Sequence, residues 1–242
     1  MSPIYPTDLP EVHQTTTAPK QQAYVEFQWD ATQKHTVSGT NTTYTPDITT
    51  PIQCMYVADR AFSGNASVER AAFENPYTQI GAYAFENCTN LKEVSFPWYM
   101  ETIAPYTFQD CISLQTLELP ETVTTIGESA FFGCTGMTGL QLNEGLQVIG
   151  KTAFYGCSSL TNVYIPDGVT EIGDYAFGNC KNLLNITIPA SVTKCGLYPV
   201  SGSADLPVEE QNVIQIFLQK ESWIDQNFDM VFGGTSCVKV YY

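Results

Sequence analysis

The chain has 242 residues, and only 14% of them are charged, well below the ~25% usual for a soluble domain. The charge is lopsided, with 10 Lys and Arg against 25 Asp and Glu and a formal net charge of −15. Binding to nucleic acid or to an anionic membrane surface needs a clustered basic face, so this composition argues against both. Apolar residues make up 43% of the chain, which is enough to bury a core and argues against wholesale disorder. The apolar runs are also far shorter than the ~20 residues of a membrane-spanning helix.

Residues 1–59 precede the repeated part of the chain. Met1–Lys20 has neither a basic start nor an apolar stretch, so it does not resemble a signal peptide, and we expect an extended arm there. Tyr24–Trp29 alternates like a strand, and Ile52–Val57 is a second candidate strand. Thr36–Thr50 is rich in Thr, Gly and Asn, which predicts a loop. We therefore expect residues 21–59 to form an N-terminal β cap that covers an exposed apolar edge.

A tandem repeat with a 23-residue period occupies residues 60–203, in about six copies. Five successive copies have a cysteine at the third position after a phenylalanine, and further apolar residues recur at fixed places around this pair. The first copy has Asn65 in place of the cysteine, and in the last copy Cys195 replaces a repeated isoleucine. The pairs are Phe85 and Cys88, Phe108 and Cys111, Phe131 and Cys134, Phe154 and Cys157, and Phe177 and Cys180.

A fixed period of about 20 to about 29 residues that carries L-x-x-L-x-L is typical of a leucine-rich solenoid. One repeat cannot bury its own Leu, Val and Phe side chains, so each must stack on its neighbours at the ~4.8 Å spacing of paired strands. Leu91–Phe96 and its equivalents are expected to form short parallel strands, and Val123–Ile126 with its equivalents a second extended rung. Glycines such as Gly150 are expected to supply a turn after that rung.

The segment Ile165–Pro189, IPDGVTEIGDYAFGNCKNLLNITIP, resembles the BspA-like leucine-rich repeat family, whose pattern is L-x-x-I-x-I-P-x-x-V-x-x-I-G-x-x-A-F-x-x-C. The resemblance covers the repeats and therefore more than half of the chain. It implies an α/β-type solenoid that is mostly β, a right-handed coil with a parallel strand ribbon. It also implies a surface-exposed bacterial or protozoan protein that binds host or matrix proteins without catalysis. The second and third copies lose parts of the P-x-x-V-x-x-I-G segment, which suggests a capping end.

After the repeats, Val213–Leu218 and Val238–Tyr242 have the apolar pattern of strands. Glu221–Phe228, which contains Trp223 and Ile224, is predicted to be a short amphipathic helix. We expect residues 204–242 to form a C-terminal strand-helix-strand cap, so that β caps close the coil at both ends.

The column of five cysteines raises the question of metal or redox chemistry. Zinc sites use ligands at close spacings such as C-x2-C, whereas these cysteines occur only once in each repeat. We favour a buried ladder of free thiols, with disulfides or a metal site as the alternatives, because Cys packs well as a small hydrophobe. The sequence does not decide whether Cys54, Cys195 and Cys237 form disulfides.

Catalytic motifs such as G-x-S-x-G, HExxH and the P-loop do not occur in the sequence. The two histidines, His13 and His35, both precede the repeats. A thin solenoid also lacks a deep pocket in which the pKa of a carboxyl group would rise. We therefore expect no enzyme activity, no cofactor and no metal.

Within each ribbon strand, the residues between the apolar positions should face solvent and form a flat surface. Tyr164 suits a recognition surface, since Tyr anchors contacts at low entropy cost; the alternative is an ordinary solvated sheet face. Four aromatic residues in outer turns, Trp98, Tyr99, Phe132 and Tyr155, form a second candidate patch, with half-buried packing as the alternative. The predicted face residues are Arg70, Glu93, Ser95, Thr116, Glu118, Gln141, Asn162, Tyr164, Asn185 and Thr187.

These features together predict a non-catalytic protein-binding or adhesion module, at the cell surface or secreted, that presents its strand face to a host, matrix or assembly protein. The alternative is a structural component of a larger assembly, such as an exterior bacteriophage virion protein anchored by its N-terminal arm. The sequence does not determine the partner or the oligomeric state.

Overall fold

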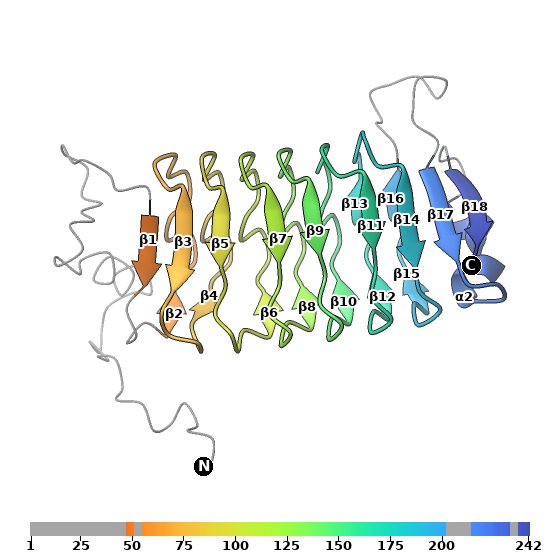
Figure 1. Ribbon diagram of the computed structural model, residues 1–242, viewed down its shortest axis with the longest axis horizontal. Coiled ribbons are helices and arrows are strands. Elements are labelled where there is room, and N and C mark those ends of the chain that lie inside the picture. The colour runs from red at the N-terminus through yellow and green to blue at the C-terminus, as the bar shows by residue number, and fades with distance from the viewer. Residues whose placement is uncertain (1–46, 51–54, 202–213, 233–236) are drawn as a thin grey trace, which may run out of the picture.

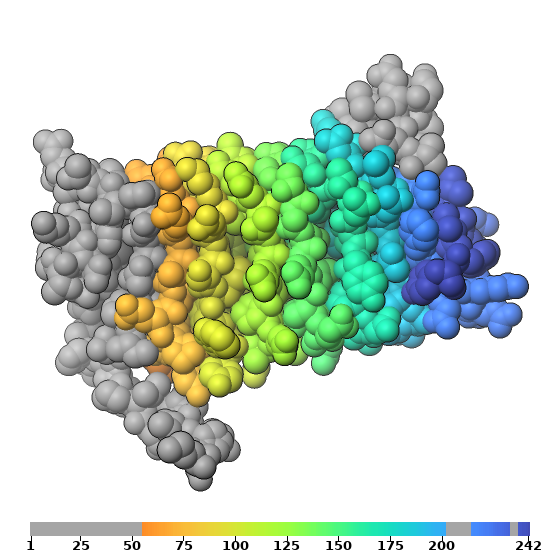
Figure 2. Space-filling view, in the orientation of Figure 1, coloured from red at the N-terminus to blue at the C-terminus, as the bar shows by residue number. Residues whose placement is uncertain are grey.

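The computed structural model describes residues 47–50 at the level of the backbone, and residues 55–201, 214–232 and 237–242 in full. Over these residues the chain winds into a β-solenoid of about seven turns, with parallel strands side by side along its length (Figure 1). The space-filling view shows an elongated body in which successive repeats follow one another from end to end (Figure 2). The predicted leucine-rich coil with a parallel strand ribbon is confirmed.

One long row of parallel strands forms a ribbon along the coil. Its hydrogen-bonded groups are β1-β3-β5, β7-β9 and β11-β14-β17-β18. The strands are β1 (Asp47–Thr50), β3 (Arg70–Phe73), β5 (Glu93–Ser95), β7 (Thr116–Glu118), β9 (Gly139–Gln141), β11 (Asn162–Tyr164), β14 (Asn185–Ile188), β17 (Ile214–Leu218) and β18 (Cys237–Tyr241).

A second row of two-residue strands runs beside the ribbon and confirms the predicted second rung. Five of these strands form one sheet in the order β15-β12-β10-β8-β6, and β2 pairs with β4. They are β2 (Tyr56–Val57), β4 (Gln79–Ile80), β6 (Thr102–Ile103), β8 (Thr125–Ile126), β10 (Val148–Ile149), β12 (Glu171–Ile172) and β15 (Lys194–Cys195).

The remaining elements lie toward the C-terminal end of the coil. One further parallel pair joins β13 (Phe177–Gly178) to β16 (Val200–Ser201). Two short helices, α2 (Trp223–Gln226) and α3 (Phe228–Phe232), stand between β17 and β18. The predicted helix over Glu221–Phe228 is therefore two helices, and α2 begins after Ser222, whose hydroxyl accepts a hydrogen bond from the N–H of Asp225.

The register of the paired strands follows the sequence period. Val148 pairs with Glu171 and Asp47 with Arg70, in each case exactly one repeat apart in the sequence. The exception is the β14–β17 pair, where Asn185 lies opposite Gln215 and the offset is longer than one repeat. Equivalent side chains therefore lie over one another along the coil, and the core consists of columns of like residues.

The phenylalanine column fills the centre of the coil. Phe85, Phe108, Phe131, Phe154 and Phe177 are fully buried. Neighbouring rings stack nearly parallel, with centroids 5.4 Å apart between Phe108 and Phe131 and 5.3 Å apart between Phe131 and Phe154. Burial of each ring contributes about 1.5–3 kcal/mol, so the column is a major source of stability.

The five repeated cysteines form a second buried column of free thiols, as predicted. Each thiol donates a hydrogen bond to the carbonyl oxygen of a phenylalanine in the preceding turn. The Sγ–O distances run from 3.1 Å, for Cys88 to Phe62 and Cys111 to Phe85, to 3.3 Å for Cys180 to Phe154. We call these five cysteines the thiol ladder. The role of each thiol is thus to pack and to satisfy a buried carbonyl group.

The glycines at the predicted turn serve a different purpose from the one expected. Residues with positive φ occur later in each turn, at positions such as Tyr106 and Asn179. Gly150 is not among the residues with positive φ, but a Cβ atom there would lie 2.7 Å from the backbone carbon of Gly127. The glycine therefore permits close approach of two successive coils.

At the ends, the structure agrees with some of the sequence predictions and departs from others. The predicted loop over Thr36–Thr50 is wrong for its last four residues, which form β1. The strands predicted over Val213–Leu218 and Val238–Tyr242 exist, but they pair in parallel with β14 and with each other and so continue the ribbon. The arm over Met1–Lys20 and the strand over Tyr24–Trp29 lie outside the described residues.

Candidate recognition surface

The outer face of the ribbon carries the ten predicted face residues. In β7 and β11 the central residue is buried and the two flanking residues are exposed. Asn185 and Thr187 in β14 are half-buried, and their neighbours Ile186 and Ile188 are buried. The alternation places these polar side chains on one surface, because successive residues of a strand point to opposite faces.

The N-terminal half of this face is charged. The Arg70 guanidinium lies 3.5 Å from a Glu93 carboxylate oxygen on the next strand, and both side chains are exposed. An exposed ion pair of this kind contributes little to stability. Glu118 lies on β7, farther along the ribbon. Together with Arg70 and Glu93, it gives this half of the face both positive and negative charges.

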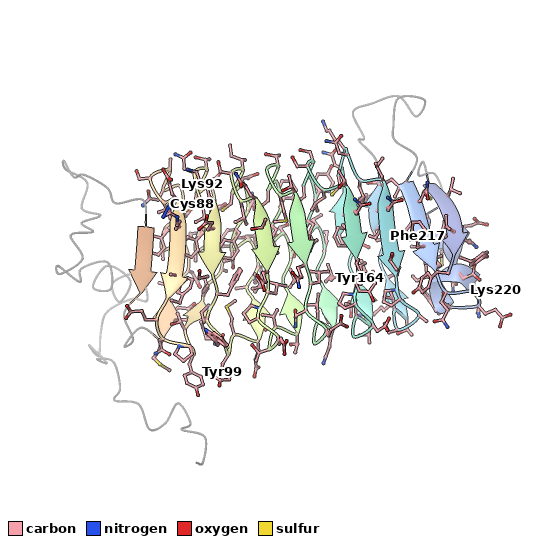
Figure 3. The ribbon with its side chains drawn as sticks, viewed as in Figure 1. Cys88, Lys92, Tyr99, Tyr164, Phe217 and Lys220 are labelled. Atoms are coloured by element: carbon pink, nitrogen blue, oxygen red, sulfur yellow. The ribbon has the colours of Figure 1, made fainter. Side chains whose placement is uncertain are left out.

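The C-terminal half of the face is polar on one row and aromatic on the other. The Asn185 amide donates to Oδ1 of Asn162 on the neighbouring strand at 2.7 Å. Tyr164, which is 57% exposed, lies opposite Thr187, and Thr187 lies opposite Phe217. Figure 3 shows Tyr164 and Phe217 on strands β11 and β17 of the ribbon. The two rings flank a threonine and lie beside the polar pair of Asn162 and Asn185.

Phe217 and its neighbour Val240 also belong to this face, although the sequence pattern did not predict them. Val240 lies opposite Phe217 in β18. The offset between β14 and β17 is longer than one repeat, so the sequence period does not predict that the ribbon continues into β17. Within the continuation, Ile214 and Cys237 are again one full period apart. Beside this region, burial and then the negative charge of Asp167 raise the pKa of Tyr242.

The four aromatic residues of the second candidate patch do not form one surface. Trp98 and Tyr99 are 78% and 53% exposed, and the Tyr99 ring stacks on Tyr77 with centroids 4.8 Å apart. Phe132 and Tyr155 stack on each other at 5.1 Å and are half-buried, as the packing alternative predicted. They lie in the turn next to the phenylalanine column, whereas Trp98 and Tyr99 follow β5.

Two adjoining depressions lie where the strands β5, β7 and β9 end. The first is lined by Trp98, Tyr99 and Glu118 among others, and the second by Glu118, Asn143 and Glu144. Val94 and Phe96, which the repeat pattern predicted to be core residues, line the first depression and are only partly buried. The surface is therefore hollowed beside the charged half of the ribbon.

Burial raises the pKa of several cysteine thiols among the described residues. Among these residues, no three His, Cys, Asp or Glu side chains are placed to hold a metal ion. Burial raises the pKa of the Cys88 and Cys180 thiols to about 12, which keeps them protonated and unreactive. Cys195 is a partly buried free thiol, and burial raises its pKa likewise to about 12. Cys54, His13 and His35 lie outside the described residues.

The strand face and its 23-residue register match a known family of repeats. A model of the BspA type leucine-rich repeat region matches residues 39–103 and 101–207, in six copies. The chain belongs to the BspA type leucine-rich repeat family. This is a family of surface and adhesion proteins, and its solenoid generally serves as a non-enzymatic scaffold for protein–protein interaction.

Two solved structures of bacterial leucine-rich repeat proteins, with TM-scores above 0.5, share the fold. One from Bacteroides ovatus is 20% identical with a TM-score of 0.61, covering 81% of this chain and 60% of its own. One from Eubacterium ventriosum is 20% identical with a TM-score of 0.53, covering 68% of this chain and 45% of its own. A leucine-rich cell surface protein from Faecalibacterium prausnitzii is 22% identical with a TM-score of 0.45, covering 74% and 62%. This chain thus spans less than two thirds of the length of each.

Two further observations bear on the remaining predictions. No curated protein matches the sequence. Within the described residues, no helix is both long enough and apolar enough to cross a membrane. The assembly alternative depends on the N-terminal arm, which lies outside the described residues, so it stays a prediction.

Proposed function

We propose that the chain is a protein-binding module that recognises its partner through the aromatic half of the ribbon face. The observation that carries this proposal is the row Tyr164, Thr187, Phe217 and Val240, which brings aromatic and apolar side chains together on neighbouring strands. Binding energy in protein interfaces concentrates in a few aromatic residues surrounded by polar groups. The paired amides of Asn162 and Asn185 supply such a polar border.

The parallel strands favour binding because they hold this face in place. Tyr164 projects from a strand whose central residue, Val163, is 4% exposed. A side chain on a rigid strand loses little backbone entropy when a partner binds. The family's association with adhesion supports a partner of host or matrix origin and a location at the cell surface.

The proposal is tested by binding the purified chain to a panel of extracellular-matrix and serum proteins with biolayer interferometry. At least one protein of the panel should bind, and the double variant Tyr164→Ala/Phe217→Ala should weaken that binding by about 2 kcal/mol. The control is Leu197→Ala/Met230→Ala, which removes two apolar side chains that are exposed away from the ribbon face. Equal loss in both variants, or no loss in the first, would place the binding site elsewhere.

The surface location has its own test. Intact cells that express the full-length protein are treated with a protease, and the chain is followed with an antibody. Rapid loss of the chain from intact cells is expected. Protection until the cells are lysed would contradict a surface location.

A further inference from the structure

The two depressions beside the ribbon form one continuous strip, which we call the edge groove. Glu118, Leu119 and Glu121 line both of them. The strip thus runs across several repeats, along the axis of the coil and past the ends of β5, β7 and β9. Its lining includes Trp98, Tyr99, Glu118, Glu121, Asn143 and Glu144.

The charges of the edge groove break a pattern that holds elsewhere in the coil. Charged side chains that are one repeat apart pair with the opposite sign, as Lys92 does with Glu69 at 2.7 Å and Lys194 with Glu171 at 2.8 Å. At the position of Glu121, by contrast, the next repeats carry Glu144 and then Asp167, all exposed. Stacked at a strand spacing of ~4.8 Å, these carboxylates repel one another.

The described part of the chain supplies no cation to this row. Among their described lining residues, neither depression has a Lys, Arg or His. Among the residues that the structure places, Glu118, Glu121, Glu144 and Asp167 take part in no ion pair. An external cation is therefore the complement that the groove lacks.

Asn143 adds an independent sign of a missing donor. This residue lines the second depression and is only 8% exposed. Its amide Nδ2 donates to the carbonyl oxygens of Glu121, at 3.1 Å, and Val123, at 2.8 Å. Its Oδ1 is buried and has no hydrogen-bond partner among the described residues. A buried acceptor without a donor is costly, so a small rotation of this side chain that lets a ligand N–H group reach Oδ1 would be favourable.

The aromatic end of the groove also suits a cation. Trp98 occupies the repeat position before Glu121 and is 78% exposed, and the neighbouring Tyr99 ring is fixed by its stacking on Tyr77. In Figure 3, Tyr99 projects from the edge of the coil away from the ribbon strands. An ammonium or guanidinium group above an exposed indole gains cation–π attraction.

We propose that the edge groove binds an extended, basic segment of a polypeptide, whose Lys and Arg side chains meet Trp98, Glu121 and Glu144 in turn. The carboxylates follow one another from repeat to repeat, so they match cations spaced along a chain. They do not converge on a single point, and the described residues include no cluster of three that is placed to hold a metal ion. This inference rests on the proposed function only in taking a polypeptide as the ligand, because it uses a different surface.

The test uses the full-length chain and two fluorescein-labelled twelve-residue peptides, one alternating Lys and Gly and the other alternating Glu and Gly. Fluorescence anisotropy at low salt should show binding of the Lys peptide and none of the Glu peptide. The variant Glu121→Gln/Glu144→Gln should raise the Kd for the Lys peptide about tenfold, and Trp98→Ala should raise it a few-fold. Affinity should fall as NaCl rises, because the contacts are exposed charges.

Two controls separate binding in the groove from attraction by net charge and from binding at the ribbon face. Glu101→Gln/Asp229→Asn removes the same number of exposed carboxylates outside the groove, and it should leave the Kd within twofold of the original. Tyr164→Ala/Phe217→Ala, the variant that tests the proposed function, should also leave the affinity for the Lys peptide unchanged. The two proposals therefore fail in different experiments.

Three outcomes would overturn the inference. Absence of binding by the Lys peptide would do so directly. An equal loss in the Glu101→Gln/Asp229→Asn control would show attraction by net charge alone. Tight binding of Ca²⁺ in calorimetry, abolished by Glu121→Gln/Glu144→Gln and blocking the peptide, would make the groove a divalent-cation site.

Discussion

The thiol of Cys134 donates a hydrogen bond to the carbonyl oxygen of Phe108, in the preceding turn, at 3.2 Å. The same contact joins Cys157 to Phe131, also at 3.2 Å. Each thiol therefore ties its own turn to the turn before it, beside the stacked phenylalanine rings. This link accounts for the choice of cysteine over a plain hydrophobe such as alanine at this position.

We expect Cys134→Ala to lower the free energy of unfolding by about 2 kcal/mol. The substitution removes a buried sulfur atom, leaves a small cavity and deprives the carbonyl of Phe108 of one donor. Cys134→Ser keeps a donor in a smaller side chain and should recover part of the loss. Urea denaturation followed by circular dichroism measures both variants, and wild-type stability in Cys134→Ala would contradict the structural role of the ladder.

The thiol ladder should not react with Ellman's reagent in the folded protein at pH 8. All five thiols are buried, and burial raises their pKa far above this pH, to about 12 for Cys88 and Cys180. In guanidinium chloride the five thiols of the ladder should react. As a positive control, Thr193→Cys places a thiol at an exposed position and should add one fast equivalent. Rapid reaction of the ladder in the native protein would show that the coil opens readily.

Gly150→Ala should cost more stability than Gly64→Ala. A Cβ atom at position 150 would lie 2.7–2.8 Å from the backbone of the preceding coil, so the two coils must separate, at a cost of about 3 kcal/mol. Gly64 has φ +75, but a Cβ atom there meets nothing within 4 Å, so only a conformational cost of about 1 kcal/mol is expected. Urea denaturation of the two variants decides the order, and the reverse order would contradict the close approach of coils.

Asp225→Asn should weaken the attachment of α2 to β18 in a pH-dependent way. Hydrogen bonds from Lys239, from the N–H of Glu221 and from the Tyr241 hydroxyl lower the pKa of Asp225 to about 2. Because the folded pKa lies below the ordinary value of 3.8, the ionised carboxylate stabilises the fold above about pH 4. That stabilisation is lost as the pH falls toward 2.

Calorimetry measures this effect as a difference in Tm between the original chain and the Asp225→Asn variant. The difference should be several degrees at pH 7 and should shrink steadily between pH 4 and pH 2. Asp229→Asn, an exposed carboxylate in α3, is the control and should change little at any pH. A difference that is constant with pH would exclude ionisation of Asp225 as its cause.

The repeated part of this fold follows from the sequence because its side chains recur at one period. A column such as Cys88 to Cys180 fixes the register, and the register fixes which residues are buried and which face solvent. The N-terminal end of the ribbon could not be predicted in this way. Its strand β1 consists of the short segment DITT, which lacks the apolar alternation of a strand. Counting back one full period from Arg70 to Asp47 is the signal that would have found it.

The candidate site was only partly predictable for the same reason. Tyr164 was placed on the ribbon face by its register, whereas Phe217 was not, because the longer offset between β14 and β17 interrupts the period before it. The row Glu121, Glu144 and Asp167 is visible in the sequence. The depression beside it is not, because Val94 and Phe96, which line it, are only partly buried where the repeat pattern predicts core residues.

The constant 23-residue register also bears on how such a protein changes in evolution. Duplication of one complete coil in the middle of the chain would place each new side chain against a copy of its former neighbour. The product would have the same internal contacts and a working surface longer by one increment of about 4.8 Å. Evolution can therefore change the length of the solenoid one repeat at a time, because each added repeat makes the same internal contacts as its neighbours.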